Sequence, residues 1–263
     1  MSVIARSAVV PLFREPTLRA EQVSQLVLGE TGRVAESRGE WRRVTTDLDG
    51  YVGWIHAGYV VEAVDDALAR WRETARGWSL GALVRVNGHH LRLPLRARLA
   101  VEPDGLRLPD GRRAVLVEGR VPDADETAAS ARASAPERWA LTHFAGAPYE
   151  WGGVTPWGVD CSGLVQTTYA ARGVALPRDS AAQVEQGDPV DPAAMLPGDL
   201  LFFRGEEMAA ITHVAFAAGG DTLVHSTVSC GGVVHEPWSA GTRAGTLRPR
   251  LVAVRRIGER RGP

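Results

Sequence analysis

The sequence predicts an α+β fold in which two small all-β barrels precede a mixed α+β domain. Short alternating runs punctuated by hairpin turns fill residues 9–62. Three Asn-Gly or Asp-Gly turn signals lie within residues 83–121, and a helical pattern followed by strands starts near residue 161. We therefore predict a first barrel at 1–65, a linker helix with a second barrel at 66–124, and the α+β domain at 125–263.

Composition places the chain among soluble globular proteins and excludes several functions. Its 263 residues are 44% hydrophobic and 23% charged, and the net charge of −1 offers no overall basic surface to a nucleic acid. All 30 basic residues are Arg, which excludes lysine-based catalysis. No apolar run approaches the roughly 18 residues of a membrane span, and no signal-peptide pattern is present. We expect a cytoplasmic protein without a membrane partner, unless an export signal has been removed.

The first all-β segment runs from Val9 to about Glu62. The stretches "SRGEW" and "DLDGY" carry the Gly and Asp residues that hairpin turns favour. Apolar residues alternate between these turns, as expected for strands with one buried face. The predicted inward positions are Val34, Trp41, Val44, Val52 and Trp54.

The second all-β segment follows a helical or linking stretch at residues 63–78. Three tight-turn signals within a short distance indicate a compact unit of short strands. These signals are Asn87-Gly88, Asp104-Gly105 and Asp110-Gly111.

The third segment begins with residues 122–138, which predict a linker or a first helix, and then becomes helix-like in "ERWALTHFAG". From Cys161 the apolar residues recur at helical spacing until Gly173, a typical C-terminal stop. Cys161 would therefore lie in the first turn of a helix. The unpaired N–H groups and the dipole at this position favour a thiolate and can also face an oxyanion.

Two histidines provide a candidate base and a group that orients it. The runs "ITHVAF" and "TLVHS" flank "AAGGD", which indicates a β-hairpin. If the loop has three residues centred on Gly219, His213 pairs directly with His225, and their Cβ atoms lie roughly 5 Å apart. A nucleophile, a base and an orienting group together are typical of a catalytic triad.

Other interpretations of these residues involve no catalysis. A cysteine is often only a small buried side chain, and paired histidines are often surface or core residues. A zinc site would need ligands at short chelate spacing, which the available residues lack. Those residues are Cys161, Cys230, His213, His225 and His235. The sequence thus implies two free thiols, no metal and no organic cofactor.

The third segment resembles the NlpC/p60 cysteine peptidases of bacterial cell-wall metabolism. The resemblance rests on "YEWGGVTPWGVDCSGLVQTTY", "LPRDSAAQ", "LPGDLLFF", "ITHVAFAAGGDTLVHS" and "LVAVRRI", in the family's order, over residues 147–257. It implies a papain-like α+β core with Cys161 as nucleophile, His213 as base and His225 as the third, orienting residue.

The resemblance extends upstream and narrows the substrate. The stretches "AEQVSQLVLGETGRVAESRGEWRRV" and "GYVGWI" resemble the bacterial SH3-like domain of the cytoplasmic γ-D-glutamyl-L-diamino acid endopeptidases, the dipeptidyl-peptidase VI subfamily. That subfamily removes L-Ala-γ-D-Glu from murein tri- or tetrapeptides whose N-terminal amine is free. The resemblance therefore implies a role in cell-wall peptide recycling.

Further residues match substrate-binding positions of that subfamily. They are Tyr149 beside the oxyanion, Asp160 at the substrate ammonium, Ser162 and Ser180 at the D-Glu part, and Glu30 and Tyr51 at the amine end of the cleft. Structural interpretations stay open, with Ser162 as a helix-start cap, Asp160 as a dipole partner and Tyr51 as barrel core.

Rival functions also stay open. An exported hydrolase of the same family would act on intact cell wall, and an inactive relative would only bind it. An acyltransferase or amidase is a further alternative. The sequence does not decide between meso-diaminopimelate and L-lysine as the diamino acid.

Overall fold

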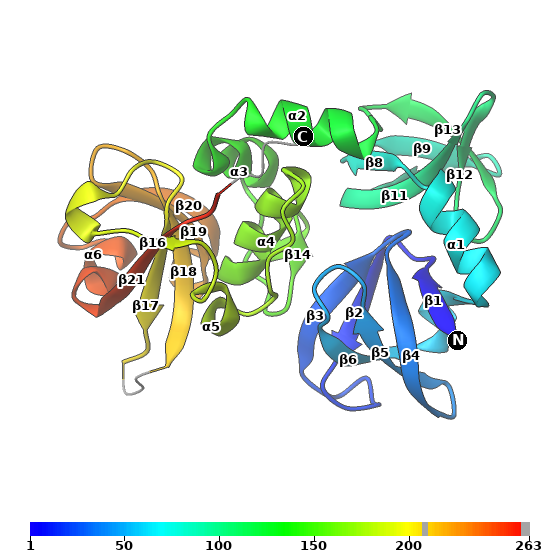
Figure 1. The fold of residues 1–263 in the computed structure, drawn as a ribbon, viewed down its shortest axis with the longest axis horizontal. Helices are drawn as coiled ribbons and strands as arrows, with labels where there is room; N and C mark the ends of the chain where they lie inside the picture. Colours follow the sequence, from blue (N-terminus) through cyan, green and yellow to red (C-terminus); the bar gives the residue numbers. More distant parts are fainter. Residues whose placement is uncertain (207–209, 259–263) are drawn as a thin grey trace. The chain divides into compact units, whose positions relative to one another are not determined.

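The computed structural model describes residues 1–206 and 210–258, which divide after Thr127 into two compact units (Figure 1). The first unit is almost entirely β, and the second combines helices with a sheet, so the predicted α+β class is confirmed. Both predicted barrels lie within the first unit. The three-domain boundaries stay a prediction, and residues 259–263 of the third domain lie outside the described residues. Within the described ranges, no helix is long and apolar enough to cross a membrane.

The first barrel is a seven-stranded antiparallel sheet in the order β3-β2-β6-β5-β4-β1-β7. Tight turns close its hairpins where the sequence predicts them, with Gly39 (φ 55°) and Gly50 (φ 71°) in the left-handed region that glycine tolerates. Its strands are β1 (Ser2–Ala5), β2 (Val9–Phe13), β3 (Gln22–Val27), β4 (Thr31–Arg38), β5 (Trp41–Thr46), β6 (Val52–His56) and β7 (Val60–Ala63).

Helix α1 (Asp65–Thr74) leads to a six-stranded sheet in the order β10-β9-β13-β12-β11-β8. Asn87 (φ 48°) and Gly88 (φ 84°) are both left-handed, as a two-residue hairpin turn requires. The strands are β8 (Gly77–Leu80), β9 (Leu83–Val86), β10 (His89–Arg92), β11 (Leu95–Glu102), β12 (Gly105–Arg107) and β13 (Arg113–Glu118).

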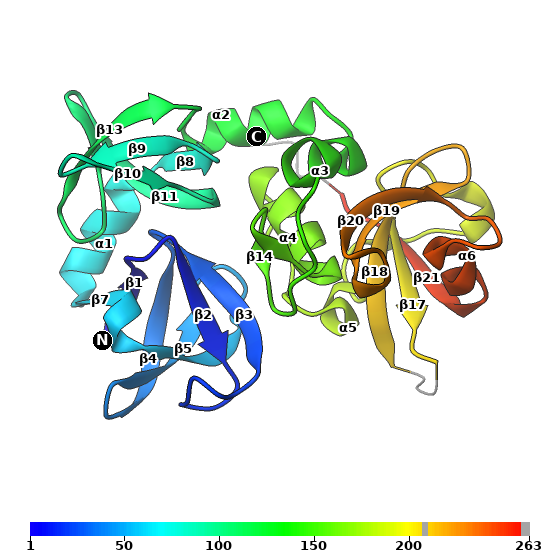
Figure 2. The same cartoon turned by 180° about the vertical axis from the view of Figure 1, so that it is seen from behind.

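The second unit has a six-stranded antiparallel sheet in the order β16-β21-β17-β18-β19-β20, with α3 and α4 on one side and α6 on the other (Figures 1 and 2). Helix α2 (Ala124–Arg132) leads into this unit. The other helices are α3 (Pro136–Phe144), α4 (Cys161–Ala171), α5 (Ser180–Gln183) and α6 (Arg243–Leu247). The strands are β14 (Val154–Thr155), β15 (Gly158–Val159), β16 (Asp188–Pro189), β17 (Leu200–Arg204), β18 (Ile211–Ala217), β19 (Thr222–Thr227), β20 (Gly232–Pro237) and β21 (Leu251–Arg256).

The predicted register of the β18–β19 hairpin is wrong by two residues. Ala217 pairs with Leu223, and the N–H of Ala218 donates to the carbonyl of Thr222 at 2.9 Å, so the loop is centred on Gly220 and not on Gly219. The physical reason is Asp221, which adopts a left-handed φ of 59° and joins the loop.

Candidate active site

Cys161 is the first residue of α4, as predicted, and is only 7% exposed. Asp160 caps the helix, because its Oδ1 accepts the N–H of Gly163 at 2.7 Å. Hydrogen bonds from the backbone N–H groups of Ser162 and Val214 lower the pKa of the thiol. Val214 lies on β18 directly after His213, so this contact places the Cys161 sulfur against β18.

The structure does not favour a preformed thiolate at Cys161. Burial, followed by the negative charge of Asp160, raises the pKa of Cys161 to about 12, while Arg178 opposes the shift. The expectation that the helix start holds a thiolate is therefore wrong for this structure. Desolvation outweighs the N–H groups at the helix start, because a buried anion loses its hydration.

His213 and His225 meet as the family resemblance implies. The Nε2 atom of His213 lies 2.8 Å from Nδ1 of His225, and the rings are nearly perpendicular at 77°. The corrected register makes them diagonal neighbours across β18 and β19, a geometry that long side chains can still bridge. Because Nε2 of His213 faces His225, Nδ1 is the ring nitrogen of His213 that this contact leaves unused.

Both histidines rest in the neutral form at neutral pH. Burial lowers the pKa of His213 well below its ordinary value, and the neighbouring His225 and Arg243 lower it further. Burial also lowers the pKa of His225 to about 4, although Glu236 opposes this shift. The structure thus combines a neutral thiol on α4 with a neutral imidazole pair on β18 and β19.

This protonation state predicts the pH dependence of thiol alkylation. In a Cys230→Ser background, the rate at which iodoacetamide modifies Cys161 is expected to keep rising between pH 7 and 10, because the thiolate fraction grows as the pH approaches the raised pKa. Mass spectrometry of the alkylated protein measures this rate. A rate that is already constant from pH 6 upward would instead show a preformed thiolate–imidazolium pair.

Sequence reasoning missed Arg178, although it lies inside the "LPRDS" motif. Its side chain is 1% exposed and forms an ion pair with Asp160 at 2.5 Å. Its Nη1 also donates to the hydroxyl of Ser162 at 2.8 Å, and Ser162 donates in turn to Asp160. A buried guanidinium requires such partners, because an unpaired charge in the interior costs several kcal/mol.

The Asp160 carboxylate already has a full set of donors. Oδ1 accepts from Ser162, Gly163 and Arg178 at 3.1, 2.7 and 3.0 Å, and Oδ2 accepts from Gly152 and Arg178 at 2.8 and 2.5 Å. A carboxylate offers about four lone-pair positions. A substrate ammonium could therefore bind Asp160 only by replacing one of these donors, so the predicted ammonium contact stays a prediction.

Tyr149 and Ser180 also lie in the second unit. Tyr149 is half-buried, and its pKa is raised by burial and by the charges that Cys161 and Asp160 would carry, which keeps the phenol a neutral donor near the thiol. Ser180 is buried in the first turn of α5. The next motif residue, Gln183, donates from Nε2 to the carbonyl of Ser162 at 3.1 Å, which ties α5 to the start of α4.

Glu30 and Tyr51 lie in the first unit, and their predicted role at the amine end stays a prediction. Tyr51 is half-buried against the core of the first barrel. Glu30 is buried and pairs with Arg96 of β11 at 2.6 Å. Arg96 reaches it from a bulge in β11, where its φ is 74°.

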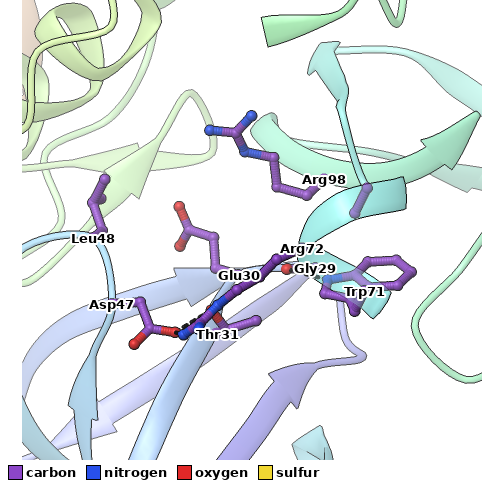
Figure 3. A pocket seen from close by; sticks show the side chains of 9 residues that line it. Gly29, Glu30, Thr31, Asp47, Leu48, Trp71, Arg72 and Arg98 are labelled. Carbon is purple, nitrogen blue, oxygen red and sulfur yellow. Dashed lines mark hydrogen bonds and ion pairs between the residues drawn. The ribbon is translucent and has the colours of Figure 1, made fainter. Parts of the chain in front are cut away.

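A cavity of about 340 Å³ in the first unit is lined by residues of α1 and of both sheets. Glu30 lies beside this cavity (Figure 3). The Asp47 carboxylate at its edge pairs with Arg72 at 2.5 Å, and the Arg98 guanidinium reaches over the same space. The charges of this cavity are thus mixed, with acids and guanidinium groups on its wall.

A second residue missed in the sequence is Glu236 of β20. Its Oε1 lies 3.0 Å from Nε2 of His225, which extends the histidine pair to a carboxylate. Among residues 1–206 and 210–258, no cluster of three or more His, Cys, Asp or Glu side chains is arranged to hold a metal ion. The site thus combines a thiol at the start of α4 with two imidazoles and a carboxylate on β18, β19 and β20.

Comparisons with known proteins agree with this architecture. The NlpC/P60 family matches residues 146–250, and the bacterial dipeptidyl-peptidase Sh3 domain matches residues 12–58. A crystal structure of an NlpC/P60 family protein from Bacillus cereus superposes with a TM-score of 0.77 at 20% identity, covering 98% of this chain and 99% of that one. This likeness confirms the fold.

Two curated relatives are named gamma-D-glutamyl-L-lysine dipeptidyl-peptidase. The one from Bacillus cereus is 27% identical over 237 residues, which cover 77% of this chain and 66% of that protein. The one from Bacillus subtilis is 44% identical over 84 residues, which cover 32% of this chain and 28% of that protein. This chain thus spans just under two thirds of the first relative's length and less than a third of the second's. Residues 146–250 belong to the NlpC/P60 family, and in this chain they follow a bacterial dipeptidyl-peptidase SH3 domain.

Proposed function

We propose that this protein is a cysteine peptidase that hydrolyses the γ-D-glutamyl bond to a diamino acid in murein peptides. The observation that carries the proposal is the Cys161 thiol at the start of α4, set against the strand whose His213 bonds to His225. The names of the two curated relatives support γ-D-glutamyl-L-lysine peptides as the substrate class. Whether the diamino acid is L-lysine or meso-diaminopimelate is part of the test.

In the proposed reaction Cys161 attacks the γ-carbonyl of D-Glu while its proton passes to Nδ1 of His213. The Cys161 thiol and the His213 imidazole are both neutral in the free enzyme, so the proton transfer accompanies the attack. The free enzyme therefore avoids a buried ion pair between them. The imidazolium then protonates the leaving amine of the diamino acid. Water hydrolyses the thioester, which releases L-Ala-γ-D-Glu and restores the thiol.

The oxyanion and the substrate have candidate partners at the same place. Backbone N–H groups at the start of α4 and the neutral Tyr149 hydroxyl would stabilise the developing oxyanion. We assign the hydroxyls of Ser162 and Ser180 to the D-Glu part. The Ser162 hydroxyl is oriented by Arg178, which donates to it at 2.8 Å. We assign the substrate ammonium to Asp160, which would exchange one of its present donors for it.

We further propose that the protein acts in the cytoplasm on released peptides, as a recycling enzyme. The distinguishing feature of such a substrate is a free α-amine on L-Ala, which intact cell wall lacks because its alanine is acylated. Recognition of this amine therefore separates the recycling enzyme from a general wall hydrolase.

The test is product analysis by mass spectrometry with two peptides, L-Ala-γ-D-Glu-L-Lys and its N-acetylated twin, and with the corresponding meso-diaminopimelate pair. We expect L-Ala-γ-D-Glu from the free-amine peptides alone. Equal cleavage of the acetylated twins would contradict amine recognition and favour the wall hydrolase. No cleavage of any peptide would favour a binding module instead, and release of a transferred acyl product would favour the acyltransferase.

A further inference from the structure

The histidine pair ends on a carboxylate that the family resemblance does not include. Nε2 of His225 lies 3.0 Å from Oε1 of Glu236, and the same oxygen accepts the N–H of Ala244 at 2.6 Å. The His225 side chain is fully buried, and that of Glu236 is 14% exposed. The carboxylate is therefore held between β20 and the first turn of α6, in a fixed position behind the histidines.

We propose that Glu236 is a positioning residue that sets the tautomers of both histidines, so that Nδ1 of His213 carries the lone pair that accepts the Cys161 proton. This inference rests on the proposed function and identifies a further member of its proton-transfer chain. It concerns two successive contacts, from Glu236 to His225 and from His225 to His213, which leave Nδ1 of His213 to accept the thiol proton.

The tautomers follow from the hydrogen-bonding capacity of each group. A carboxylate oxygen that already accepts a backbone N–H meets His225 as an acceptor, so Nε2 of His225 must carry the hydrogen. Neutral His225 then has a bare Nδ1, which can only accept. Across the 2.8 Å contact, Nε2 of His213 must therefore donate. Neutral His213 is left with a bare Nδ1, the form that a general base requires.

The charge of Glu236 also favours the protonated state that forms during the reaction. Burial lowers the pKa of both histidines, the charge of His225 lowers the pKa of His213 further, and the Arg243 guanidinium on α6 acts on both in the same direction. Glu236 acts in the opposite direction, because its charge and its hydrogen bond both raise the pKa of His225. It thus offsets part of the cost of placing a proton on the imidazole pair.

The strand register explains why the contact exists. His225 of β19 pairs with Val234 of β20, and Glu236 lies two positions further along the same face. This makes His225 and Glu236 diagonal neighbours, just as His213 and His225 are across β18 and β19. The chain of polar contacts therefore crosses three adjacent strands in two diagonal steps.

The experiment combines imidazole ¹⁵N NMR with kinetics on the full chain. In the wild type at pH 7.5 without substrate, we expect both His213 and His225 to carry hydrogen on Nε2. In Glu236→Met no acceptor remains for Nε2 of His225, so the tautomers of both histidines are no longer fixed and Nδ1 of His213 keeps its lone pair in only part of the molecules. We expect kcat to fall on the order of 10²-fold with little change in KM, because only the molecules with a bare Nδ1 on His213 can accept the thiol proton. Glu236→Asp is expected to restore the wild-type tautomers and part of kcat.

Glu206→Met is the matched control, because Glu206 pairs with Arg250 at an exposed position and the same change there should leave tautomers and kcat unchanged. The proposal is overturned if wild-type His225 carries its hydrogen on Nδ1, a result that needs no variant to fold. It is also overturned if Glu236→Met keeps the wild-type tautomers and kcat. The expected tautomers together with no peptide cleavage by the wild type would contradict the proposed function while leaving the positioning role intact.

Discussion

Replacing Cys161 by alanine is expected to abolish hydrolysis of the γ-D-glutamyl peptide, with kcat falling at least about 10⁴-fold. The neighbouring Ser162 hydroxyl is not expected to take over as nucleophile, because it is held between Asp160 and Arg178. The release of L-Ala-γ-D-Glu, followed by mass spectrometry under single-turnover conditions, measures the loss.

Cys230→Ala is the matched control for this prediction. Cys230 is an exposed thiol in the short 3-10 helix Val228–Cys230, so its removal should leave activity and thermal stability unchanged. Cys161→Ala removes a single buried sulfur atom and should also fold, which a thermal unfolding curve can confirm. Hydrolysis by Cys161→Ala within tenfold of the wild type would assign the reaction to another residue.

Replacing Arg178 by methionine is expected to cost about 3–5 kcal/mol in the free energy of unfolding. The substitution removes the only cation paired with the buried Asp160 among the contacts described, while nearly preserving the side-chain volume. It leaves a carboxylate 5% exposed without a compensating charge. Chemical denaturation of the full chain, with separate fits to each transition, measures the loss in the second unit.

Two comparisons identify the cause of this loss. Arg113→Met breaks the exposed pair with Asp104, whose side chains are 64% and 56% exposed, and should change stability by less than about 1 kcal/mol. The double variant Arg178→Met with Asp160→Asn should lose less than the sum of the single variants, because the unpaired charge is gone. Additive losses would show that Arg178 contributes through packing alone.

The sequence predicts local features of the site well. Helix α4 starts at Cys161 and ends before Gly173 (φ 78°), and both ends depend on residues close in the sequence. The apolar periodicity and the capping residue are therefore enough to predict them. The hairpin turn at Asn87-Gly88 is equally local. The contact between His213 and His225 was also anticipated, although through a register that the structure corrects.

Other features depend on residues far apart in the chain. Asp221 and the two glycines before it can all adopt left-handed conformations, so the sequence alone does not define which three residues form the loop. The contact of Glu236 with His225 depends on the β19–β20 register, and the burial of Arg178 depends on the packing of α4. The thiolate expectation was wrong because the desolvation of Cys161 arises only after folding.

The high pKa of Cys161 also bears on how the protein withstands oxidants. Peroxides react with thiolates far faster than with thiols, and they need access to the sulfur. A neutral thiol that is 7% exposed is doubly protected between catalytic cycles. The surface thiol of Cys230 is the more accessible target, so mild oxidative damage would fall on a residue outside the chemistry and leave the reactive sulfur reduced.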